Sequence, residues 1–110
     1  MEVQIRAELK HAYEQAIRQV FTFEPYVIYS KSRYMRYVDA RRFIMALLRT
    51  WHYSYKTIGS VFAFDHSTII HHVQLHNDWI ESDTAYKEKY ESFCNWVNFY
   101  LLEQEKEVEA

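Results

Sequence analysis

Four polar residues in a row, Asp65-His66-Ser67-Thr68, stand directly before a run of apolar residues. Aspartate is a favourable helix N-cap, because its carboxylate accepts a hydrogen bond from a free backbone N–H at the helix start. A helix that begins here carries His66, Ser67 and Thr68 on its first turn, with His71 one turn later. Recognition helices of helix-turn-helix proteins present the polar side chains of their first turns to the DNA major groove. The segment therefore predicts a helix that reads DNA.

The residues on either side of this segment have the layout of a helix-turn-helix. Ser54 is a suitable N-cap for a short helix over Tyr55–Phe62, and only Ala63 and Phe64 separate that helix from Asp65. A short helix, a tight connection and a longer helix with a polar start are the parts of this motif. Apolar residues at helical spacing predict the buried faces, which contain Ile58, Val61 and Phe62 in the first helix and Ile69, Ile70, Val73 and Ile80 in the second.

A basic segment overlaps the start of this motif. Residues 31–56 contain seven Lys and Arg side chains and one Asp, a net charge of +6, so the remainder carries −8 against an overall charge of −2. A local basic region binds polyanions even when the whole chain is acidic. A solvated charged surface is the alternative, and proximity to the Asp65 helix favours phosphate contact. The cations are Lys31, Arg33, Arg36, Arg41, Arg42, Arg49 and Lys56.

Three further helices complete an all-α domain of about five helices. A first amphipathic helix is predicted over residues 2–20 and ends before Pro25, because proline disfavours helical geometry in the residue before it. A second helix is predicted to begin at Asp39, with Arg41, Arg42 and Arg49 leaving it sideways. Its apolar stripe contains Ala40, Phe43, Ile44, Leu47, Leu48 and Trp51.

The last helix is predicted over residues 83–104, followed by a frayed acidic tail over residues 105–110. A helix of that length exceeds what a small domain needs to cover itself. Its far half carries Trp96, Phe99 and Tyr100, which pack either back on the first helix or on a partner. A second copy of the chain and a replication protein are both open as that partner.

Composition limits the possible classes of protein. Hydrophobic residues make up 49% of the 110 residues, which suffices for one packed domain over residues 1–110. One Gly and one Pro favour helices joined by short polar loops. The single cysteine, Cys94, suits a reducing interior. Neither a membrane span nor a leader peptide is evident, so we expect a cytoplasmic protein with no membrane partner.

Histidines and the cysteine offer little for catalysis. His72 and His76 stand four residues apart and could share a metal on one helical face. No Glu lies between them, and Asp78 is not on the same stripe. Cys94 lies beside the apolar stripe of the last helix, where a lone cysteine is usually a core residue. We therefore expect no enzyme activity, no metal and no cofactor.

Residues from about 30 to 76 resemble the C-terminal DNA-binding domain of the bacterial replication initiator DnaA. The most specific part is Asp65-His66-Ser67-Thr68-Ile69-Ile70-His71 after an Ile-Gly and a Phe, where Ser54 to Phe62 match the preceding short helix. Lys31 to Arg36 match the basic loop of the family, and Ala40-Arg41-Arg42 match the start of the helix after it. The resemblance implies an all-α, Trp-repressor-like helix-turn-helix fold.

The resemblance also implies roles for individual residues. Asp65, His66, Ser67 and Thr68 would approach the major groove, at base edges or phosphates. Lys31, Arg33 and Arg36 would correspond to the basic loop, from which family members send an arginine into the neighbouring minor groove. Arg41 matches the arginine at the following helix start, and Lys56 lies where the first helix of the motif meets the DNA backbone. Double-stranded DNA is the implied partner, in replication control or regulation.

Three features depart from the family pattern. Ala63-Phe64 replaces a Gly-Gly-Arg-type basic link, and His72 stands where a small alanine is usual. We expect no counterpart of the initiator's ATPase module here: because Gly59 is the only glycine of these 110 residues, they contain no phosphate-cradling G-x-x-x-x-G-K-[ST] loop, and no nucleotide is expected. The alternative function is a protein-interaction module of the same fold that binds a replication factor and not DNA. Overall acidity, the missing arginine and the aromatic last helix support that alternative.

Overall fold

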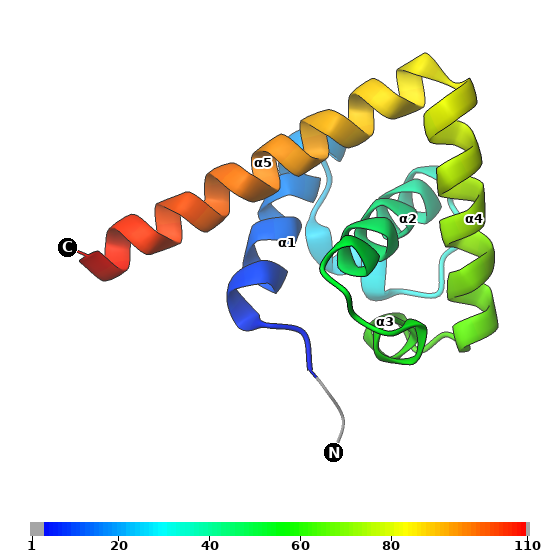
Figure 1. The fold of residues 1–110 in the computed structure, drawn as a ribbon, viewed down its shortest axis with the longest axis horizontal. Helices are drawn as coiled ribbons and strands as arrows, with labels where there is room; N and C mark the ends of the chain where they lie inside the picture. The colour runs from blue at the N-terminus through cyan, green and yellow to red at the C-terminus, as the bar shows by residue number, and fades with distance from the viewer. Residues whose placement is uncertain (1–3, 110) are drawn as a thin grey trace.

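A computed structural model describes residues 4–109, with side chains as far as residue 106. Over these residues the chain forms five α-helices and one short 3-10 helix, and no strand occurs among them (Figure 1). The all-α fold expected from the sequence is confirmed. The elements are α1 (Ala7–Phe21), η1 (Pro25–Tyr29), α2 (Met35–Thr50), α3 (Tyr55–Phe62), α4 (His66–Ser82) and α5 (Thr84–Glu109).

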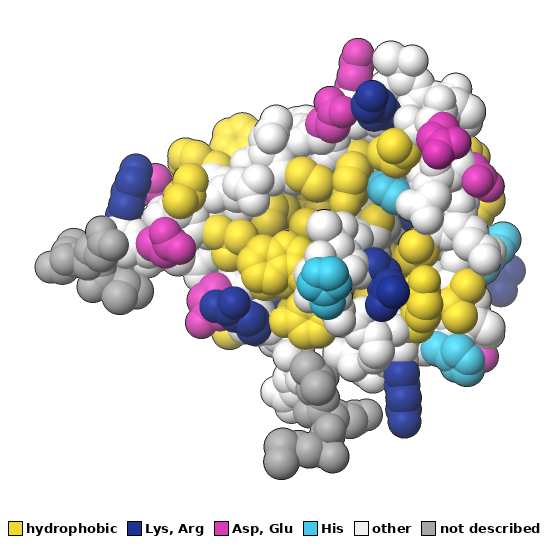
Figure 2. Space-filling view, viewed as in Figure 1, with side chains coloured by type: hydrophobic (Ala, Val, Ile, Leu, Met, Phe, Trp, Pro, Cys, Tyr) yellow, Lys and Arg dark blue, Asp and Glu magenta, His cyan; other side chains and the backbone are white. Residues whose placement is uncertain are grey.

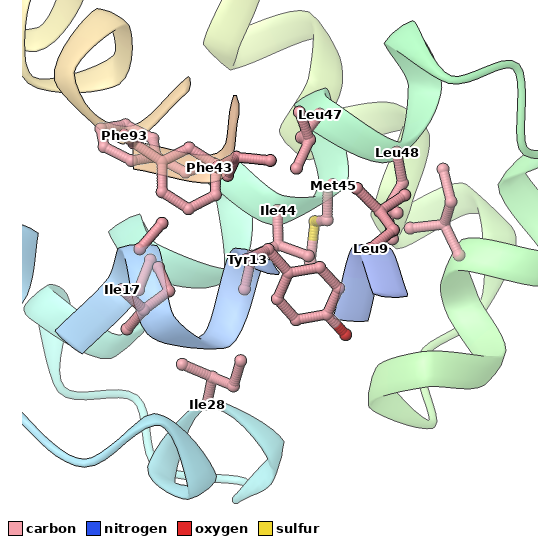
Figure 3. Packing of buried hydrophobic residues seen from close by; sticks show 14 of the residues in the cluster. Leu9, Tyr13, Ile17, Ile28, Phe43, Ile44, Met45, Leu47, Leu48 and Phe93 are labelled. Carbon is pink, nitrogen blue, oxygen red and sulfur yellow. The ribbon is translucent and has the colours of Figure 1, made fainter. Parts of the chain in front are cut away.

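Helix α2 is the centre of the fold, and every other element packs against it. Its residues from Ala40 to Leu48 are all buried, because neighbours cover it on every side. Figure 3 shows side chains of α1 pointing toward Ile44 and Met45 of α2, while Phe43 lies beside Phe93 of α5 with ring centroids 5.7 Å apart. Each such side chain contributes about 1.5–3 kcal/mol by burial. The predicted apolar stripe of this helix is confirmed up to Leu48, whereas Trp51 is 36% exposed.

Two predicted helix starts are wrong. The first helix begins at Ala7, because residues 4–6 are not helical, and residues 2–3 lie outside the described part of the chain. The second helix begins at Met35 and not at Asp39, which lies inside α2 and pairs with Arg42 at 3.1 Å. Just before the start of α2, the Ser32 hydroxyl accepts a hydrogen bond from the Tyr34 N–H at 3.2 Å.

The last helix is longer than predicted. It begins at Thr84, where the Asp83 carboxylate accepts from the Tyr86 N–H at 3.1 Å, and continues to Glu109. The acidic segment expected to fray is therefore helical as far as the structure describes it. Figure 1 shows α5 crossing α1, and the Gln104 side chain donates to the Glu8 carbonyl at 3.1 Å. Of the two placements considered for its far half, packing on the first helix is the one observed.

The turn between α3 and α4 is built as the sequence predicts. The Ser54 hydroxyl caps α3 by accepting from the Thr57 N–H at 3.1 Å. Ala63 ends this helix in the left-handed region with φ 56°, and the Phe64 N–H donates to the Gly59 carbonyl at 2.9 Å. A Cβ atom at Gly59 would lie 2.4 Å from the Phe64 carbonyl oxygen. The close approach of the chain after α3 therefore requires glycine at this position.

A buried histidine joins α4 to α5. His76 is 5% exposed, its Nδ1 lies 2.7 Å from the Tyr86 hydroxyl, and its ring packs on Tyr90 with centroids 4.4 Å apart. Burial, reinforced by the charge of Arg42, lowers the pKa of His76 to about 4. The spacing Ile69, Val73, His76 and Ile80 was the signal for its core position.

None of the described helices is both long and apolar enough to cross a bilayer.

We predict that Gly59→Ala lowers the free energy of unfolding by about 1–3 kcal/mol, because the added methyl meets backbone that side-chain rotation cannot move. Chemical denaturation followed by circular dichroism measures this change. Ser60→Ala on the exposed face of the same helix is the matched control and is expected to stay within about 0.5 kcal/mol of wild type. Equal stability of the Gly59→Ala and Ser60→Ala variants would contradict the turn geometry described here.

We also predict that folding stability falls as the pH drops from about 6.5 toward 4. The pKa of His76 is about 4 in the folded state and 6.5 for the free side chain, so the unfolded state binds more protons in that window. His76→Gln keeps a hydrogen-bonding partner for Tyr86 and removes the titration. Urea denaturation at pH 7 and pH 5 should show a smaller pH effect in this variant, by on the order of 1 kcal/mol. An unchanged pH effect would contradict a neutral, buried His76.

Candidate nucleic-acid interface

The first turn of α4 carries an exposed polar cluster. Asp65 has the extended backbone of an N-cap residue, and its carbonyl accepts from the Thr68 N–H at 3.0 Å. Its carboxylate makes no cap bond to a backbone N–H, and instead accepts from the Ser67 hydroxyl at 2.7 Å and lies 3.1 Å from His66 Nδ1. The hydrogen bond from Ser67 and the nearby His66 lower the pKa of Asp65. The predicted N-cap position is therefore confirmed, while the predicted cap bond is wrong because these neighbours occupy the carboxylate.

Lys31 links the basic loop to the turn between α3 and α4 by hydrogen bonds. Its ammonium donates to the carbonyls of Ala63 at 3.0 Å and Phe62 at 3.3 Å, which are free at the end of α3. It also lies 4.8 Å from the centroid of the Phe64 ring. The connection between α3 and α4 contains only Ala63 and Phe64 and has no cation of its own. The Lys31 ammonium, from the loop before α2, places a positive charge there.

The loop before α2 and the first turns of α4 share one groove of about 470 Å³. Lys31 and Arg33 line it from the loop, and Thr68 and His72 line it from α4. Arg33 is exposed, and it makes no hydrogen bond or ion pair with the described side chains. His72 was not among the predicted contact residues, although its position one helical turn after Thr68 was the signal that could have identified it.

Two predicted contact residues, Arg41 and Arg42, are buried, so the expectation that they leave α2 sideways is wrong. Arg41 is 4% exposed and donates to the carbonyls of Ile28, Ser30 and Ser32, each at 2.7 Å. Burial lowers the pKa of Arg41. Its guanidinium thus holds the backbone of the loop that carries Lys31 and Arg33, and its role is to shape that loop.

Arg42 is 3% exposed and extends under α4. Its guanidinium donates to Asp39 at 3.1 Å and to His72 Nδ1 at 3.2 and 3.3 Å. It also stacks 4.5 Å from the Trp79 ring centroid. Contact with DNA would require this side chain to leave all of these partners, so we leave both buried arginines out of the proposed contact surface.

The remaining predicted residues divide between two regions. Arg36 donates to the Phe21 carbonyl and lies 5.7 Å from the Phe23 ring centroid, so the structure places it at the end of α1 and not in the groove. Lys56 on α3 and His71 on α4 are exposed. In Figure 2, Lys, Arg and His side chains lie along the edge formed by α3 and α4, and acidic side chains gather at the α4–α5 corner and along α5.

These elements define a helix-turn-helix domain with a basic loop beside it. The motif consists of a short helix, a tight turn that packs closely against Gly59, and a second helix with an exposed polar first turn. A family model described as "Bacterial dnaA protein helix-turn-helix" matches residues 14–75, more than half of the chain. The chain belongs to this family, which is a family of DNA-binding helix-turn-helix domains and is not an enzyme family. The match begins in α1, earlier than the resemblance seen in the sequence, and it stops before α5. No curated protein and no solved structure gave a match.

Arg41 and Arg33 are predicted to differ in what they stabilise. Arg41→Met leaves three carbonyls without their charged donor, and it should lower the free energy of unfolding by about 2–4 kcal/mol. Arg33→Ala removes an exposed side chain with no partner among the described residues, and should change that free energy by less than about 0.5 kcal/mol. Urea denaturation of both variants measures the difference. A similar loss in both would contradict the structural role assigned to Arg41.

Proposed function

We propose that this protein binds double-stranded DNA with a preference for sequence, and acts in replication control or regulation. In this proposal the first turns of α4 enter the major groove, and the loop at residues 31–33 contacts the adjacent backbone and minor groove. The observation that carries the proposal is the shared groove, which brings Lys31 and Arg33 next to Thr68. Together with Lys56, these cations offer a local positive surface on a chain of net charge −2.

The exposed side chains divide into two kinds of contact. Lys31, Arg33 and Lys56 suit phosphates, which fix the position of a protein on the duplex without reading its sequence. His66, Ser67, Thr68 and His71 carry the donors and acceptors that discriminate base edges in the major groove. Asp65 suits the amino group of cytosine and orients His66 and Ser67 through the contacts described above.

A second function, docking of a replication protein, is favoured by a specific surface. Phe99 is 47% and Leu102 56% exposed on the far half of α5. A separate groove of about 360 Å³ lies where α5 meets α1 and the end of α2, lined in part by Leu9, Trp51 and Leu101. Salt distinguishes the two functions, because neutralising phosphates makes affinity fall steeply with salt, and an apolar protein interface does not behave in this way.

The experiment that tests the proposal is fluorescence-anisotropy titration with a duplex that carries an initiator box and with a scrambled duplex, each at low and moderate salt. Preference for the box with a steep salt dependence supports the proposal. Absence of binding at low salt would overturn it, and equal affinity for both duplexes would overturn the sequence preference.

Side chains that read bases and side chains that contact phosphates are predicted to give different results in that assay. His66→Ala or Thr68→Ala should reduce discrimination between the duplexes by about 1–3 kcal/mol, the range for a lost base contact. Lys56→Ala or Arg33→Ala should weaken binding to both duplexes and lower the salt slope by about one. The same pattern for the His66 and Lys56 variants would contradict this division.

A further inference from the structure

His72 lies where α4 faces the basic loop. It lines the same groove as Lys31, Arg33 and Thr68, and its side chain is half-buried. Arg42 does not line this groove, and its guanidinium contacts the imidazole at the Nδ1 edge. The Nδ1 edge of the ring therefore faces Arg42, whereas Nε2 has no partner among the described residues and is not buried, so it is accessible from the groove.

The contact with Arg42 fixes the tautomer of His72. Arg42 Nε and Nη2 lie 3.3 and 3.2 Å from His72 Nδ1. A guanidinium has five N–H donors and no acceptor, so Nδ1 must accept with its lone pair. In the neutral ring the proton then resides on Nε2, the nitrogen at the opposite edge. His72 is thus a hydrogen-bond donor toward the groove.

Arg42 is itself held in place, so it can orient the ring. It is 3% exposed, its Nη1 donates to Asp39 at 3.1 Å, and its guanidinium stacks on Trp79. The side chains Asp39, Trp79 and Arg42 come from the two helices that meet at this point, α2 and α4. The imidazole therefore has a defined tautomer before any ligand arrives.

The charges around His72 favour a neutral ring. Arg42 and Arg41 face it from α2, His71 precedes it on α4, and Lys31 and Arg33 line the groove from the loop. Asp39, the one carboxylate of this group, pairs with Arg42. Burial first and then Arg42 lower the pKa of His72 to about 4. A neutral donor gains less from a phosphate than a cation does, and suits the uncharged acceptors of base edges.

We propose that His72 is a specificity-determining residue, which donates from Nε2–H to a base acceptor in the major groove, and that Arg42 is the positioning residue that fixes its tautomer. The acceptors available there are N7 and O6 of guanine, N7 of adenine and O4 of thymine. This inference rests on the proposed DNA-binding function and adds a base contact one turn beyond the polar first turn of α4.

The tautomer is tested on the wild-type protein with ¹⁵N-labelled histidine. Long-range ¹H–¹⁵N spectra should show the His72 proton on Nε2 and no titration between pH 5.5 and 8. The Nε2 resonance should shift when the preferred duplex is added. A proton on Nδ1, or titration of His72 in that range, would overturn the proposal whatever the DNA result.

The base contact is tested by selecting bound duplexes from a randomised library and sequencing them. His72→Ala should reduce the preference at one base pair about tenfold, with little change at the other positions and in binding to random DNA. His72→Gln offers an acceptor to Arg42 and an N–H₂ donor to the groove, so it should recover part of the preference. His11→Ala, an exposed histidine on α1, is the matched control.

The outcomes separate the two proposals. If the wild-type protein selects a site and His72→Ala selects the same site with the same preference at every position, the role of His72 is overturned and DNA binding stands. If the wild-type protein binds no duplex, the proposed function fails, and the specificity role fails with it. Circular dichroism of each variant shows that it is folded before its selectivity is compared.

Discussion

Two consecutive buried arginines of the central helix, Arg41 and Arg42, impose the main constraint on this structure. A charge removed from water must be hydrogen-bonded, since leaving it unpaired costs several kcal/mol. Arg41 meets this requirement with three carbonyls of the loop before α2, and Arg42 meets it with Asp39 and the ring of His72. One arginine thus shapes the basic loop and the next supports the recognition helix. Both halves of the proposed interface are held from the same turn of α2.

The proposed interface depends on local charge and on close backbone packing. Gly59 lets the chain after α3 pass close to that helix, which sets the direction of α4. Lys31 then joins the loop to the same turn through the carbonyls of Phe62 and Ala63. On the face shown in Figure 2, acidic side chains gather at the α4–α5 corner and along α5, while Asp65 lies within the proposed interface. A chain of net negative charge can in this way offer a positive surface to a polyanion.

The sequence predicts the motif well because its signals are local. The Ser54 cap and the Asp65 start are each fixed by a few neighbouring residues, and both lie where they were predicted. Arg41 and Arg42 were misplaced because charge alone predicts exposure, and only the tertiary structure supplies the carbonyls and the imidazole that pair with them. Helix boundaries at Met35 and Glu109 were missed because no strong cap residue marks either one.

In the proposed function, the loop at residues 31–33 and the start of α4 act as one DNA-binding surface. The most direct measurement is the map of backbone ¹H–¹⁵N shift changes when an initiator-box duplex is titrated into the protein. We expect the largest changes at residues 31–33, 56 and 64–72, and no change at the apolar groove between Trp51 and Leu101. Changes centred on α5, or at the α4 residues without the loop, would contradict this expectation.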